Sequence, residues 1–138
     1  MEGATEFCWS KASELEPTDF DDATTFLNFL RYVPDQSKAK AEYERLVGHV
    51  FESGLVADVD ATGYVFKPLD WAGTPDHPLR KHFRQEDVDA HLDVIETGQE
   101  PDGGRNITWE SISPSCEMAW RGAVTLQNLM TLRANGRL

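Results

Sequence analysis

Residues 85–97 read QEDVDAHLDVIET, and this stretch carries the clearest fold signal in the chain. Val88, Leu92 and Ile95 recur at the spacing of one helical face, which predicts an amphipathic helix packed against a core. Gly98 follows directly and is typical of a helix end. A second face of the same helix carries a row of carboxylates, namely Glu86, Asp89, Asp93 and Glu96.

Similar periodicity predicts three further helices, over about residues 18–33, 37–53 and 114–134. Ser113 and Pro114 form a typical N-cap and first position for the last of them. Apolar residues go most of the way round that helix, so we expect it to be central and covered on two sides. A short helical turn is predicted over residues 79–83.

Strand signals lie between these helices. Leu55–Val59 and Tyr64–Leu69 predict a hairpin around the turn at residues 60–63, and Ile107–Ile112 predicts a third strand. Residues 1–16 show no clear period and are interpreted as a poorly ordered or strand-like lead-in. The predicted fold is a single α+β domain over residues 1–138, mainly helical, with a small two- to three-stranded antiparallel sheet.

Composition limits the class of protein. The chain has 138 residues, of which 40% are hydrophobic, and this is too apolar for a disordered acidic tail. No apolar run approaches the ~20 residues that a membrane helix needs. With only Cys8 and Cys116 and no secretion signal, a cytoplasmic location is expected.

The net charge of −11 is concentrated in two blocks. Residues 1–22 hold seven acids against Lys11 alone, and residues 86–102 hold seven acids with no Lys or Arg. Like charges at helical spacing destabilise a helix by a few tenths of a kcal/mol per pair. The row on residues 85–97 is therefore either kept for binding, for example as a mimic of nucleic-acid phosphates, or is a solvated face that aids solubility.

Residues 58–65, DVDATGYV, resemble the first eight positions of an EF-hand calcium loop. The resemblance implies weak metal ligation by Asp58, Asp60 and Thr62. It stops at position 12, where the family places a bidentate Glu and this chain has Leu69. A turn without any ligand explains the same residues.

The same stretch resembles the nucleophile motif of the haloacid dehalogenase phosphatases, Asp-x-Asp-x-Thr. That resemblance implies Asp58 as nucleophile and Asp60 as acid/base. The family continues into a parallel sheet, whereas the pattern after residue 70 is mostly helical. No catalytic pair, zinc spacing or cofactor motif is found elsewhere, so neither an enzyme nor a cofactor is predicted.

Trp71 lies in a turn-rich stretch and has two interpretations: an exposed anchor for a partner, or a cover for one end of the hairpin. Together these observations predict a small acidic protein-interaction domain of the inhibitor, immunity or counter-defence type. Its partner is expected to be a basic protein, such as a nucleic-acid-processing enzyme or a toxin, bound through the carboxylate row and Trp71. A winged-helix-like nucleic-acid-binding module is the alternative, although the net charge opposes phosphate contacts.

Overall fold

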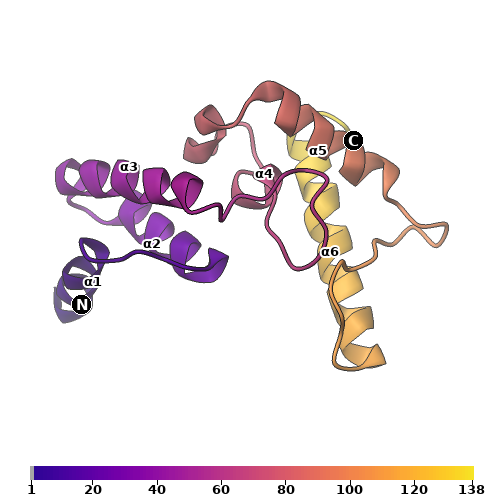
Figure 1. Ribbon diagram of the computed structural model, residues 1–138, viewed down its shortest axis with the longest axis horizontal. Coiled ribbons are helices and arrows are strands. Elements are labelled where there is room, and N and C mark those ends of the chain that lie inside the picture. The colour runs from indigo at the N-terminus through magenta and orange to yellow at the C-terminus, as the bar shows by residue number, and fades with distance from the viewer. Residues whose placement is uncertain (1) are drawn as a thin grey trace. The chain divides into compact units, whose positions relative to one another are not determined.

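The computed structural model describes residues 2–138, and its contacts divide the chain into two compact units, Met1–Val56 and Ala57–Leu138. Every regular element among residues 2–138 is a helix, as Figure 1 shows. None of the helices in this range combines the length and the apolar character needed to cross a bilayer. That the chain acts as a single domain stays a prediction.

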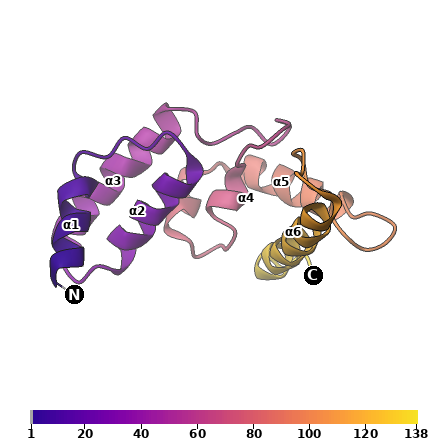
Figure 2. The ribbon, with the colours of Figure 1, turned by 90° about the horizontal axis from the view of Figure 1, so that it is seen from below.

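The first unit contains α1 (Glu2–Ala12), α2 (Phe20–Tyr32) and α3 (Gln36–Glu52). The carboxylates of Asp19 and Asp35 cap α2 and α3, each accepting a hydrogen bond from a backbone amide three residues ahead. α2 and α3 lie side by side in Figures 1 and 2. Their apolar faces supply the core of this unit: Ala23, Leu27, Leu30, Ala39, Tyr43, Leu46, Val47 and Val50.

α1 is a helix that the sequence did not predict, because residues 1–16 were interpreted as a poorly ordered or strand-like lead-in. Its Trp9 ring meets Phe29 of α2 edge to face at 5.4 Å, and the Lys38 ammonium of α3 lies 4.3 Å from the Trp9 ring centroid. Arg45 Nη2 donates to the Ala12 carbonyl at 2.6 Å. These tertiary contacts hold a segment whose own hydrophobic periodicity is weak, which explains why periodicity missed it.

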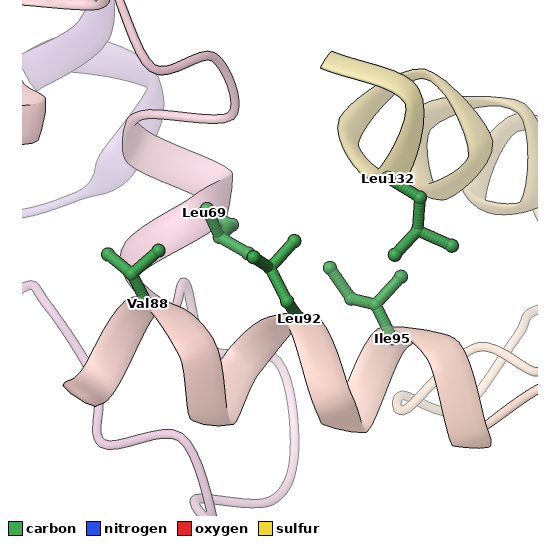
Figure 3. Close-up of a cluster of buried hydrophobic side chains, with 5 residues drawn as sticks. All are labelled: Leu69, Val88, Leu92, Ile95 and Leu132. Carbon is green, nitrogen blue, oxygen red and sulfur yellow. The ribbon is translucent and has the colours of Figure 1, made fainter. Parts of the chain in front are cut away.

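The second unit contains α4 (Pro68–Trp71), the 3-10 helix η1 (Pro78–His82), α5 (Gln85–Thr97) and α6 (Pro114–Ala134). The bounds predicted for α5 and α6 are confirmed, and Ser113 Oγ caps α6 by accepting from the Cys116 amide. Figure 3 shows the core of the unit, in which side chains of α4, α5 and α6 meet: Leu69, Val88, Leu92, Ile95 and Leu132.

The predicted antiparallel sheet, and with it the α+β class, is wrong: residues 2–138 contain no strand. In place of the hairpin, a single backbone hydrogen bond joins the Ala57 amide to the Phe66 carbonyl at 2.8 Å. An isolated pair of strands is marginal in water. Pro68 instead occupies the first position of α4 and directs the chain into a helix.

The absence of strands among the described residues also bears on two other interpretations of the sequence. A winged-helix module needs a hairpin wing, and a haloacid dehalogenase domain needs a parallel sheet, so the described residues lack the framework of both. Residues 107–112, the predicted third strand, are also irregular.

α6 differs from its prediction in burial. Only Thr131 and Leu132 are buried, and Met118, Trp120, Leu126 and Met130 are exposed. The end of the helix is held by Asn135, whose side chain accepts from Arg80 Nη2 at 2.8 Å and donates to the Gly73 carbonyl at 2.8 Å. α6 is therefore anchored at its C-terminal end and is not covered on two sides.

Candidate functional site

The predicted carboxylate row lies on the outward side of α5. Glu86, Asp93 and Glu96 are exposed and Asp89 is partly buried, while the opposite side of the helix fills the core. Gln85 Nε2 donates to Asp89 Oδ1 at 2.9 Å. The four carboxylates thus lie on a helix whose opposite side is held in place by packing in the core.

Two arginines from outside the row partly neutralise it. Arg84 Nη1 lies 2.7 Å from Glu86 Oε1, and Arg137 Nη1 lies 3.0 Å from both Asp93 Oδ1 and Glu96 Oε2. The hydrogen bond to Asp93 is the largest cause that raises the pKa of Arg137. The row is therefore partly balanced, by Arg84, which directly precedes α5, and by Arg137, which is distant in sequence.

Trp71 is not on the surface that an anchor would need. Its side chain is 3% exposed, and its indole N–H donates to the Phe66 carbonyl at 3.3 Å. Of the two interpretations of Trp71, the structure agrees with packing: the side chain packs close to the segment that was predicted as a hairpin.

The loop around Asp58, Asp60 and Thr62 contains a positive charge. Lys67 Nζ donates to the Val59 carbonyl at 2.7 Å, so an ammonium group lies against the backbone of this loop. Within residues 2–138, no group of three or more His, Cys, Asp and Glu side chains is arranged to hold a metal ion. The cation interpretation gains no support from this geometry.

A groove of about 860 Å³ lies within the second unit, between α5, the N-terminal half of α6 and the segments before each. Four aromatic rings line it in an unbroken edge-to-face series. Phe66 and Tyr64 are 5.2 Å apart between centroids, Tyr64 and Trp109 are 5.4 Å apart, and Trp109 and Trp120 are 5.7 Å apart. This groove could not be predicted from the sequence, because its aromatic residues are separated by up to 56 positions and share no local pattern.

Titratable groups also line the groove. His91 Nδ1 accepts from the Leu69 amide at 3.1 Å, so the neutral ring carries its hydrogen on Nε2. Burial is the main cause that lowers the pKa of His91 to about 4, and Lys67 adds to it. Burial in the groove wall raises the pKa of Asp70 although solvent still reaches its carboxylate, and a hydrogen bond from the Lys67 amide acts in the opposite direction. At neutral pH His91 is therefore a hydrogen-bond donor without charge.

Comparison with family models, curated proteins and solved structures finds no match for this chain. The features of this chain that bear on its function are therefore the α5 row and the groove themselves.

Proposed function

We propose that this chain is an acidic interaction protein of the inhibitor or immunity type, which docks on a basic partner through the carboxylate row of α5. The row consists of Glu86, Asp89, Asp93 and Glu96. The proposed partner is a protein whose own surface binds nucleic acid, because carboxylates at helical spacing offer such a surface the charge that phosphates offer.

One observation carries the proposal: the row already holds an arginine. Arg137 Nη1 lies at 3.0 Å from Asp93 and from Glu96 at once, so the spacing of these two carboxylates suits a guanidinium group. Charge-assisted hydrogen bonds of this kind are stronger than neutral ones. In the proposed complex, a partner arginine or lysine takes the place of Arg137.

The carboxylate row is expected to contribute more to partner selection and to the association rate than to the affinity of the complex. Exposed ion pairs contribute roughly 0–1 kcal/mol each, so four carboxylates alone do not make a tight complex. A net charge of −11 does accelerate encounter with a basic protein at low salt. We place this encounter in the cytoplasm, since Cys8 and Cys116 are both free thiols.

The test uses salmon protamine, an arginine-rich chain, as a basic probe. Glu86→Gln, Asp89→Asn, Asp93→Asn and Glu96→Gln together should weaken binding by at least about tenfold, measured by titration calorimetry at about 50 mM salt, where screening is weak. The single change Arg137→Gln should tighten binding, because it frees Asp93 and Glu96.

A matched control keeps the total charge equal. Changing Glu6, Glu14, Glu16 and Glu52 to Gln removes the same four charges from exposed positions of the first unit. Its expected effect is less than about threefold. Equal weakening by both sets of changes would show that only net charge matters and would contradict a docking face on α5.

A further inference from the structure

Arg105 is the least expected residue of the groove. It follows a tight turn in which the Gly103 amide donates to the Glu100 carbonyl at 2.8 Å and Gly103 adopts a φ of +84°. The Arg105 amide then donates to Thr125 Oγ1 of α6 at 2.9 Å. The backbone of Arg105 is thus fixed from both sides, and its side chain is directed inward.

The Arg105 side chain is buried without a partner. The residue is 5% exposed, yet no side chain or carbonyl among residues 2–138 accepts a hydrogen bond from its guanidinium or pairs with it. Burial accordingly lowers the pKa of Arg105, and no nearby acid opposes that shift. Solvent in the groove still reaches the guanidinium nitrogens, because none of them is a fully buried atom without a partner. A negative group in the groove would therefore reach them and form charge-assisted hydrogen bonds.

The guanidinium of Arg105 lies close to Gly98 at the end of α5. A Cβ atom at residue 98 would lie 3.1 Å from Arg105 Nη1, and both Gly98 and Arg105 line the groove. The carbonyl end of α5 gives the charge some support through the helix dipole. A dipole is a weaker counterpart than an anion, so this site still favours a negative group.

The remainder of the groove suits a flat apolar body. The ring series of Phe66, Tyr64, Trp109 and Trp120 forms an aromatic wall, and Trp120 keeps 53% of its surface exposed. His91 Nε2–H has no acceptor within the described chain and adds a neutral donor. A volume of about 860 Å³ falls in the range of small-molecule sites.

We propose that this groove binds a small planar organic monocarboxylate, with its carboxylate on Arg105 and its apolar body against the aromatic wall. One guanidinium balances one negative charge. Lys67 also lines the groove, but its ammonium donates to the Val59 carbonyl, and the acids Asp70 and Glu110 line the groove as well. A dianion such as a phosphate ester is therefore disfavoured. The site is separate from the α5 row, so this inference does not depend on the docking proposal.

The test compares 2-naphthoate with the isosteric neutral 2-naphthamide on the full chain by titration calorimetry. We expect 2-naphthoate to bind with a dissociation constant below about 1 mM. The dissociation constant of 2-naphthamide should be at least about tenfold higher, because the neutral amide cannot form the charge-assisted pair with Arg105. Inorganic phosphate should not compete. No binding of 2-naphthoate at about 5 mM, or equal binding of the two compounds, would overturn the proposal.

Two matched variants locate the charge. Arg105→Met should lower 2-naphthoate affinity by about tenfold or more and leave 2-naphthamide affinity unchanged. It should not lower the melting temperature, because the guanidinium makes no hydrogen bond within the described residues that the change would remove, and methionine keeps a side chain of similar length. Arg133→Met, at an exposed arginine of α6 that pairs with no acid among the described residues, should change neither the affinity for 2-naphthoate nor the melting temperature. Full retention of 2-naphthoate binding in Arg105→Met would refute the site.

Discussion

α5 and α6 were both predicted from hydrophobic periodicity and caps, yet they use their apolar residues differently. In α5, Val88, Leu92 and Ile95 are all buried in the core of the second unit. In α6, Met118 and Leu126 keep 67% and 61% of their surfaces exposed. Periodicity thus indicates where a helix lies, whereas burial depends on which other segments reach it.

The N-terminal half of α6 is held by polar contacts in place of a core. Arg121 Nη2 pairs with Asp102 at 2.9 Å, Thr125 Oγ1 accepts the Arg105 amide, and Ser113 caps the first turn. The Ser113 cap and the hydrogen bond to Thr125 each contribute on the order of 1 kcal/mol. These contacts leave the apolar surface of α6 available and at the same time build one side of the groove.

The largest expected difference between the two helices comes from truncating a leucine in each. Leu92→Ala should reduce the free energy of unfolding by about 2–5 kcal/mol, because it removes a buried side chain and leaves a cavity. Leu126→Ala should change it by less than about 0.5 kcal/mol. Urea denaturation followed by circular dichroism measures both. A loss in Leu126→Ala as large as that in Leu92→Ala would mean that this face of α6 is buried in solution.

A second expected difference concerns pH, because His91 belongs to α5. Its pKa is about 4 in the fold and its ordinary value is 6.5, so the unfolded chain binds the proton more strongly. Stability is therefore fully present above about pH 6.5 and falls as the pH drops towards 4, by up to about 3 kcal/mol.

Subtraction isolates this histidine from other titrating groups. His91→Gln, which can still accept from the Leu69 amide, should flatten the stability profile between pH 4 and 6.5. His82→Gln, at an exposed histidine, serves as the matched variant. A profile unchanged by His91→Gln would show that His91 titrates normally.

The smallest expected difference comes from adding a methyl group to a glycine of each helix region. Gly98→Ala should destabilise by about 1–2 kcal/mol, because its Cβ would lie 2.9 Å from the Val94 carbonyl oxygen. Gly122→Ala, with no atom within 4 Å, should stabilise α6 by about 0.5–1 kcal/mol. Thermal melts decide the sign. Stabilisation by Gly98→Ala would contradict this prediction, because it would mean that the backbone makes room for the Cβ near the Val94 carbonyl oxygen at no cost.

Helix bounds were predictable where local chemistry sets them. Gly98 and the Ser113–Pro114 pair mark helix ends through capping and backbone geometry, which need no distant partner. The hairpin prediction failed because β-prone residues such as Tyr64 and Phe66 use their rings in the groove wall and make no ladder. β-propensity reflects packing against neighbours, and the sequence does not name those neighbours.

The two candidate sites differ in the same way. The α5 row was predictable, since its four carboxylates share one helix, but Arg137 was not, because it lies 41 residues from Glu96. Nothing in the sequence around Arg105 indicated that its side chain is buried. A single arginine in a glycine-containing loop is normally solvated, and only the contacts of Gly98 and Thr125 show that it is buried.

The ring series from Phe66 to Trp120 also has a spectroscopic aspect. Tyr64, Trp109 and Trp120 are held within 5.4–5.7 Å of their neighbours at angles of 80–81°, so their electronic transitions are coupled. Such chirally arranged rings produce near-ultraviolet circular dichroism that depends on their mutual geometry. The groove therefore contains its own chromophores, and a bound molecule that alters the geometry of these rings changes a near-ultraviolet signal that the unmodified chain already gives.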